Sequence, residues 1–384
     1  MNRYLLRNEN FGGLLYDREN IQTYLFNKKR FKSVLEKNPP NTEIVLNDCV
    51  NCSTLNAPTR VFLILTNRCN LNCIYCSNYS DTNKIEELTF EEVSLLLHEF
   101  KKMGVFEISL GGGEPLCHPD FFKIVKLAKK LGFVILMNSN GIYTNEQKKF
   151  LVESGIDKIK ISIDGVGEKN DILRGKNSFK QAWSSVKYLK EKGKRVKVNC
   201  TLLRKNFDGA FELSKLCNDN GISLKIAPMY YVGRGRFIKE KPILLTEIID
   251  LKDKINKYCK EKQIENLTNI ASALFGQISG EKGEFVEKHI ECCINRMHMS
   301  VNMDGNVIPT GCQTCFNKYM AMGNIKSENC LDIWKKIQVY NDKKKESTKE
   351  CRECDIVKKF GNYFIITNEF HGEVRENEKS KIIF

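Results

Sequence analysis

Short apolar runs alternate with amphipathic stretches between residue 58 and about residue 240. The stretches between the runs have the helical period, as at residues 89–102, which open with a Thr-x-x-Glu capping signal, and at residues 178–192. Six strand and helix units predict an α/β fold, with a parallel sheet and its helices outside. The apolar runs predict strands at residues 61–66, 105–110, 133–138, 157–164, 195–202 and 222–228.

The segments on either side of this pattern predict smaller additions. Residues 1–57 form a short preface, with strands at 11–17 and 22–26 and a helix at 29–37 that ends before two prolines. We expect a core at residues 58–240, a mostly helical bridge at 241–288 and a separate tail at 289–384. The tail has an expected hairpin at 299–309 with an Asp-Gly turn and a helix around 331–337.

The composition is that of a folded cytoplasmic protein. Hydrophobic residues make up 41% of the 384 residues, no apolar run is long enough to cross a bilayer, and the start lacks the apolar core of a secretion signal. The net charge of +14 comes from lysines scattered among glutamates, which favours solvated helix faces over a nucleic-acid surface. A positive mouth could still attract an anionic or acidic substrate.

Sixteen cysteines are many for a reducing compartment, and they favour metal ligation over disulfides. Cys69, Cys73 and Cys76 follow the first expected strand at C-x3-C-x2-C spacing. Three thiolates on one loop suit an iron-sulfur cluster with one open iron, because no fourth cysteine or histidine lies close by to close a zinc site. An incomplete zinc knuckle or three unrelated buried thiols remain the alternatives.

A glycine-rich turn follows the second expected strand, with Gly112, Gly113 and Glu114 in sequence before a proline. Consecutive glycines leave bare backbone that a ligand can approach, and the carboxylate suits an ammonium group. Together, the cysteine loop and this turn resemble the radical S-adenosylmethionine (SAM) superfamily over residues 58 to 355. The resemblance implies a partial (β/α)6 barrel of TIM type, open on one side.

The resemblance also implies roles for single residues. Cys69, Cys73 and Cys76 would hold a 4Fe-4S cluster whose open iron binds SAM, with Tyr75 against the adenine. Gly112, Gly113 and Glu114 would receive the methionine amino group. In this resemblance, Ser162 would lie near the ribose and Arg174 near the SAM carboxylate. The other cofactor-binding positions that it implies are Asn140 and Asp164. No residue is assigned as a catalytic proton or hydrogen donor.

The tail adds cysteines on both sides of the expected hairpin. It resembles the auxiliary-cluster extensions of the superfamily, closer to the shortened twitch form than to the longer SPASM form. One auxiliary 4Fe-4S cluster is expected, with Cys292 and Cys315 as substitute ligands and a zinc site as the alternative. Its ligands would be Cys293, Cys312, Cys351 and Cys354. The pair Cys49 and Cys52 stays unassigned, and five other cysteines are expected to be buried apolar residues: Cys117, Cys200, Cys217, Cys259 and Cys330.

The resemblance implies an oxidoreductase that cleaves SAM reductively and abstracts hydrogen from its substrate. The preface opens like the peptide-recognition domains of maturases of ribosomally made peptides, although it is too short for the whole domain. We therefore expect oxidative modification or crosslinking of a peptide or protein, with a flavodoxin or ferredoxin as electron donor and no membrane or nucleic-acid partner. The alternatives are a dehydrogenase or cyclase acting on a small molecule or cofactor precursor, and a zinc-stabilised binding protein.

Overall fold

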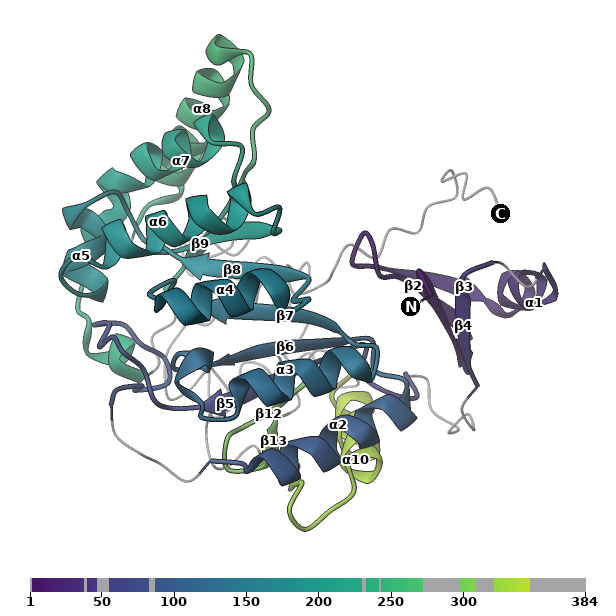
Figure 1. Cartoon of the computed structure of the whole chain (residues 1–384). Coiled ribbons are helices and arrows are strands. Elements are labelled where there is room, and N and C mark those ends of the chain that lie inside the picture. Colours follow the sequence, from purple (N-terminus) through teal and green to yellow (C-terminus); the bar gives the residue numbers. More distant parts are fainter. Residues whose placement is uncertain are drawn as a thin grey trace.

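The computed structural model describes residues 2–37, 40–46, 55–82, 87–229, 233–241, 243–271, 297–308 and 321–345. Two sheets organise this part of the chain, a large one at its centre and a small one formed by the N-terminal residues (Figure 1). No helix of the described residues combines the length and the apolar composition that a membrane span needs.

Six parallel strands form the middle of the large sheet, and all six were predicted within a few residues. They lie side by side in chain order, as expected for repeated strand and helix units. Their bounds are β5 (Arg60–Thr66), β6 (Glu107–Gly112), β7 (Val134–Ser139), β8 (Lys158–Ser162), β9 (Val196–Leu202) and β10 (Ser223–Pro228). The α/β fold with a parallel sheet is confirmed.

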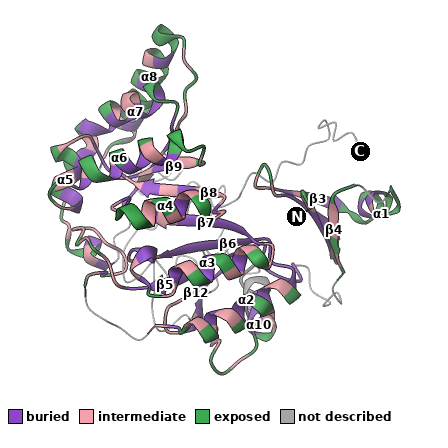
Figure 2. Ribbon diagram, viewed as in Figure 1, coloured by how far each residue is buried: buried purple, intermediate pink, exposed green. Residues whose placement is uncertain are grey.

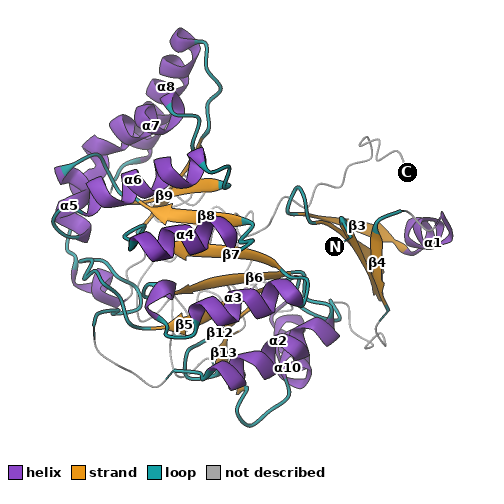
Figure 3. Ribbon diagram, viewed as in Figure 1, coloured by secondary structure: helices purple, strands orange, loops and turns teal. Residues whose placement is uncertain are grey.

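Helices cover one face of this sheet (Figure 3). The first begins with the predicted capping box, in which Thr89 and Glu92 bind each other's backbone N–H groups. The helices are α2 (Phe90–Met103), α3 (Phe121–Lys130), α4 (Asn145–Glu153), α5 (Glu168–Arg174), α6 (Ser178–Glu191), α7 (Ala210–Asp219) and α8 (Leu245–Lys262). Short 3-10 turns occur at η1 (Pro115–Cys117), η2 (Arg204–Gly209) and η3 (Gly233–Phe237).

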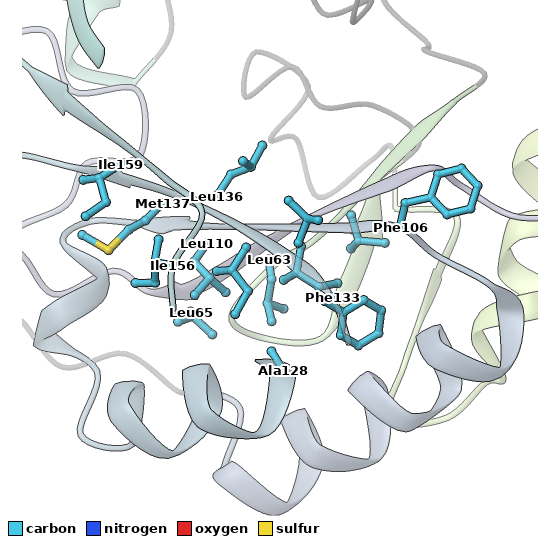
Figure 4. Packing of buried hydrophobic residues seen from close by; sticks show 14 of the residues in the cluster. Leu63, Leu65, Phe106, Leu110, Ala128, Phe133, Leu136, Met137, Ile156 and Ile159 are labelled. Carbon is cyan, nitrogen blue, oxygen red and sulfur yellow. The ribbon is translucent and has the colours of Figure 1, made fainter. Parts of the chain in front are cut away.

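The apolar core lies between the sheet and these helices. Side chains such as Leu63, Leu110 and Met137 point from the strands towards the helix that carries Ala128 (Figure 4). The central strands are buried along most of their length, whereas the outer helix faces are exposed (Figure 2). Burial of this apolar surface is the main stabilising contribution to the fold.

The large sheet continues beyond the six strands at both edges. On one side β11 (Thr268–Ile270) pairs with β10. This strand lies within residues 241–288, which were expected to be mostly helical. On the other side β12 (His298–Val301) lies parallel to β5, followed by β13 (Asn306–Ile308) and β14 (Gly323–Asn324). The predicted hairpin with its Asp-Gly turn is thus confirmed, and α10 (Cys330–Lys345) includes the predicted helix of the tail.

The N-terminal sheet has four strands, of which the sequence predicted two. Its order is β3 (Gln22–Asn27), β2 (Gly12–Asp17), β1 (Tyr4–Glu9) and β4 (Thr42–Val45), and α1 (Lys28–Lys37) packs on it. Strands β1 and β4 were missed because their polar residues interrupt the alternation that marks a strand.

A fully buried arginine joins this small sheet to the barrel. The guanidinium of Arg7 donates to Glu9 Oε1 at 2.7 Å, to the carbonyl of Ala57 at 2.7 Å and to that of Gly104 at 2.8 Å. It also lies over the ring of Phe106, at 4.8 Å from the centroid. Because every contact except that with Glu9 leads to the barrel, Arg7 helps to hold the small sheet at the barrel's amino end, together with the stacking of Tyr16 on Phe106 and the hydrogen bond from Arg18 to the carbonyl of Gly132.

Replacing Arg7 with methionine should therefore strongly destabilise the protein. The change leaves Glu9 charged and buried without its partner, which costs about 3–5 kcal/mol in comparable cases. Urea unfolding followed by circular dichroism measures the effect. Arg3→Met is the matched control, because Arg3 also pairs with carboxylates but its side chain is 41% exposed. Equal shifts of the unfolding midpoint in the two variants would contradict this account.

Candidate functional site

The three cysteines lie on a loop, residues 67–81, that leaves the carboxyl end of β5; we call it the cysteine loop. Its two ends are joined by a hydrogen bond from the N–H of Cys69 to the carbonyl of Asp81, at 2.6 Å. Within it, the N–H of Cys76 donates to the carbonyl of Cys73 at 3.2 Å. The loop is thus closed on itself at the end of the barrel where such folds place their active sites.

The glycine turn after β6 packs directly on the start of the cysteine loop. The N–H of Gly113 donates to the carbonyl of Thr66 at 2.7 Å, and the N–H of Glu114 to that of Arg68 at 2.9 Å. A Cβ at Gly112, where φ is +141°, would lie 2.3 Å from Thr66 O, and one at Gly113 would lie 2.4 Å from Arg68 O. The bare backbone was expected to admit a ligand. In the structure it admits the chain itself.

Glu114 lies buried beside this contact, where Ser139, Asn140 and the backbone N–H of Leu116 donate hydrogen bonds to its carboxylate. Ser139 Oγ donates to it at 2.9 Å, and the backbone N–H of Asn140 does so at 2.8 Å. Burial raises the pKa of Glu114 to about 7, and these hydrogen bonds oppose the increase. A nearby ammonium group would restore the charged form.

Asn140 links Glu114 to the cysteine loop. Its amide nitrogen Nδ2 donates to Asn70 Oδ1 at 2.6 Å and lies 3.7 Å from Cys69 Sγ. The N–H of Leu71 points to the same sulfur at 3.4 Å. Donors directed at a sulfur stabilise a thiolate, so Cys69 is placed as a metal ligand would be.

The chemistry of the three thiols fits a cluster. Burial raises the pKa of Cys69 to about 12 and also raises that of Cys73, so metal binding would have to displace these protons. Among the residues that the structure describes, no three His, Cys, Asp or Glu side chains converge as ligands of one metal ion do. In a four-iron cluster each thiolate binds its own iron, which allows the ligands to stand further apart.

The other described cysteines separate into two groups. Cys200, Cys217, Cys259 and Cys330 are buried, as predicted. Cys117 is only partly buried, contrary to the prediction, because it ends the 3-10 turn after Glu114 instead of facing the apolar core.

Tyr75, Asp164 and Arg174 form one polar network at the other side of the loop. Asp164 is fully buried and accepts from the hydroxyl of Tyr75, from Arg174 Nη1 at 3.0 Å and from the N–H of Thr201 at 2.8 Å. The network joins the cysteine loop to the ends of β8 and β9. Ser162 is the last residue of β8, two positions before Asp164 in the sequence, and its side chain is partly exposed.

Arg234, in η3, is a site residue that the sequence did not reveal. Its backbone N–H donates to the carbonyl of Cys76, Nε to that of Cys73 and Nη2 to that of Ser80, each at 2.8 Å. Gly233 precedes it with φ +55°, and a Cβ there would lie 2.3 Å from Cys76 O. The Gly-Arg pair was the available signal, but such a pair is equally common in solvated loops.

The four expected auxiliary ligands, Cys293, Cys312, Cys351 and Cys354, lie outside the described residues, as do Cys49, Cys52, Cys292 and Cys315. The described hairpin of β12 and β13 falls between the first two of them in the sequence.

Family comparisons agree with this geometry. The radical SAM superfamily matches residues 63–215, and the iron-sulfur cluster-binding SPASM domain matches residues 292–355. The chain carries a radical SAM domain and a SPASM domain. The resemblance to this superfamily is therefore confirmed, as is an iron-sulfur cluster-binding tail. The matching model of the tail is SPASM, whereas the sequence favoured the shortened twitch form, and the number of clusters in the tail stays a prediction.

Two curated relatives differ in how much of the chain they match. Pre-heme d1 synthase of Dinoroseobacter shibae is 36% identical over 175 residues, which are 44% of this chain and 43% of that protein. The chain thus spans less than half the length of this relative. Mycofactocin maturase MftC of Mycobacterium tuberculosis is 26% identical over 305 residues, which are 78% of this chain and 76% of that protein.

Solved structures confirm the barrel-type fold. SuiB of Streptococcus suis bound to S-adenosylmethionine has a TM-score of 0.71 and 17% identity, and covers 93% of each chain. SuiB bound to its precursor peptide SuiA has a TM-score of 0.67 and 19% identity, and covers 86% of this chain and 87% of that one.

The close packing of the glycine turn predicts that Gly113→Ala prevents correct assembly of the cysteine loop. The added Cβ would overlap the carbonyl of Arg68, so the variant should hold much less iron after anaerobic reconstitution. Gly111→Ala is the matched control, because a Cβ there meets its nearest atom at 3.7 Å. Iron and sulfide analysis measures the difference, and equal iron contents would contradict the proposed packing.

Proposed function

We propose that this protein is a radical SAM enzyme that oxidatively modifies or crosslinks a ribosomally made peptide. The observation that carries the proposal is the cysteine loop, fixed between the glycine turn and Arg234 in a chain that carries both domains. When bound, the 4Fe-4S cluster supplies the electron that cleaves SAM to methionine and a 5'-deoxyadenosyl radical, which takes hydrogen from the substrate.

The protein's own residues bind and orient the cofactor. We assign Cys69, Cys73 and Cys76 as the cluster ligands, because they share one closed loop. Glu114 would receive the SAM ammonium group, since its buried carboxylate lacks a cationic partner within hydrogen-bonding distance among the described residues.

The remaining predicted contacts surround these groups. Arg174 would hold the SAM carboxylate while it keeps Asp164 as its internal partner. Tyr75 would pack on the adenine by its ring, because its hydroxyl is already bound to Asp164. Asn140 would position Cys69, the backbone of Gly112 and Gly113 would line the amino group, and Ser162 would lie near the ribose.

A peptide substrate is supported by how far the similarity extends. The match to mycofactocin maturase continues through three quarters of the chain, whereas that to pre-heme d1 synthase covers less than half. The fold likeness to SuiB, whose structure is known with its precursor peptide, extends over most of the chain. The match to the synthase keeps small-molecule chemistry as the second candidate.

The proposal includes one auxiliary cluster and partners outside the chain. Cys293, Cys312, Cys351 and Cys354 would hold a cluster that accepts an electron from the substrate or binds it directly. A flavodoxin or ferredoxin would supply the first electron. We place the protein in the cytoplasm, because oxygen-labile clusters need a reducing compartment.

Anaerobic reconstitution followed by dithionite and SAM should yield 5'-deoxyadenosine and about eight irons per chain. The double variant Cys351→Ala and Cys354→Ala should lose about half of the iron, because it removes the ligands of one cluster of two. The matched control, Cys217→Ala and Cys259→Ala, removes two buried thiols and should retain all of it. Zinc in place of iron, or no SAM cleavage by the fully loaded protein, would refute the proposed function.

The raised pKa of Glu114 predicts pH-dependent binding of SAM. Below pH 7 the carboxyl is mostly protonated and cannot attract an ammonium group, so affinity should increase as pH rises through about 7. Calorimetry on the reconstituted protein between roughly pH 6 and pH 8 measures this. Glu114→Gln should bind at least about tenfold more weakly, without that increase. Glu91→Gln, which alters an exposed helix residue, is the control and should behave as the parent. If the SAM affinity of Glu114→Gln increased with pH as it does in the parent, the pH dependence would belong to another group.

A further inference from the structure

The face of the barrel sheet opposite the helices carries lysines. Ile159 and Ile161 of β8 are buried in the core against the helices, so the alternating residues Lys158, Lys160 and Ser162 lie on the other face. On β9, Lys197 pairs in register with Lys160. This inner face is therefore cationic over at least two neighbouring strands.

Such an interior differs from that of an ordinary barrel. The inside of a closed (β/α)8 barrel is filled by layers of bulky apolar side chains. Here the inner positions of β8 and β9 are lysine, serine, asparagine and threonine, including Asn199 opposite Ser162, and they are partly exposed. Lysine is also depleted in strands generally. The inner face thus suits a polar guest better than a packed core.

The charges near Lys160 are mostly of one sign. Burial, together with the neighbouring charges of Arg60 and Lys158, lowers the pKa of Lys160 to about 7, against the opposing effect of the carboxylate of Glu107. That carboxylate is already paired with Arg60. Within the described part of the chain, neither Lys158 nor Lys160 has a hydrogen bond or an ion pair. Two half-buried ammonium groups without partners are costly, and an anion would stabilise them.

The lysines lie within reach of the proposed reaction site. Ser162, at the cofactor end of β8, is two residues beyond Lys160 on the same face, which corresponds to about 7 Å along a strand. Lys158 is two residues further, about 13 Å from Ser162. A peptide side chain that reacts next to the cofactor would therefore have its flanking residues beside these ammonium groups.

We propose that Lys158 and Lys160, together with Lys197, bind a carboxylate of the peptide substrate on the inner face of the barrel. The preferred substrate then carries Asp or Glu, or its own carboxyl terminus, within a few residues of the modified position. This inference rests on the proposed function and adds to it the chemical class of the residues that flank the modified position.

Binding of three short fluorescent peptides to the reconstituted full chain with SAM tests the inference. In each peptide, glycine alternates with a second residue type. The first has glutamates and a blocked carboxyl terminus, the second has glutamines and a blocked terminus, and the third has glutamines and a free terminus. Fluorescence anisotropy should detect binding of the first peptide, the third or both, and no binding of the second. Binding of the first indicates recognition of a side-chain carboxylate, and binding of the third indicates recognition of the carboxyl terminus.

Variants then assign the binding to the inner face. Lys158→Gln with Lys160→Gln should weaken it at least about tenfold, whereas Lys160→Arg, which keeps the charge, should retain it. Lys32→Gln with Lys257→Gln is the matched control, because these two lysine side chains are 80% and 79% exposed and the net charge changes equally. The melting temperature of the inner-face variant should not decrease, because like charges are removed.

Three results would overturn the inference. They are no binding of either carboxylate peptide, equal weakening in the control pair, and a lower melting temperature with unchanged binding, which would show that the chain itself neutralises the lysines. Because anisotropy does not depend on turnover, failure to form 5'-deoxyadenosine would refute the proposed function without deciding this binding result.

Discussion

The contact between the end of β5 and the glycine turn after β6 is the constraint on which the site depends. Two main-chain hydrogen bonds hold Gly113 and Glu114 against the start of the cysteine loop, and side chains at the two glycines would separate the segments. The loop has no helix or strand of its own, so it is positioned by its attachments. Arg234 supplies a second attachment, from the far end of the barrel sheet, and the network of Tyr75, Asp164 and Arg174 supplies a third. A ligand set must be held rigidly to bind one cluster, and these attachments contribute to that rigidity.

Local patterns predicted what depends on local physics. Alternating apolar runs located all six central strands, because each run must bury one or both faces in the sheet. The same patterns could not show that β12 pairs with β5, since this pairing is decided by contacts between residues more than two hundred positions apart in the sequence. Arg7 was missed for a related reason. It stands between the apolar Leu6 and the polar Asn8, and its burial is stabilised by distant carbonyls that no motif records.

The candidate site was predictable where covalent or steric chemistry dictates the residue type. Cysteine spacing and consecutive glycines are such features, and the structure brings Cys69, Gly113 and Glu114 into one region. The role expected for the glycines was only partly correct, because their lack of side chains allows the chain to pack against itself. Arg234 escaped prediction because an arginine can satisfy carbonyls in any loop, and the choice among loops is made by the fold.

The two charged networks of the site differ in a way that bears on function. Asp164 is buried with a complete set of donors, including the guanidinium of Arg174, so its charge is stabilised without any ligand. Glu114 is equally buried but receives only neutral donors, and burial raises its pKa because these donors do not fully compensate for the loss of water. A carboxylate kept in this state gains most from a cation that arrives with a ligand, so binding and charge stabilisation occur in the same step.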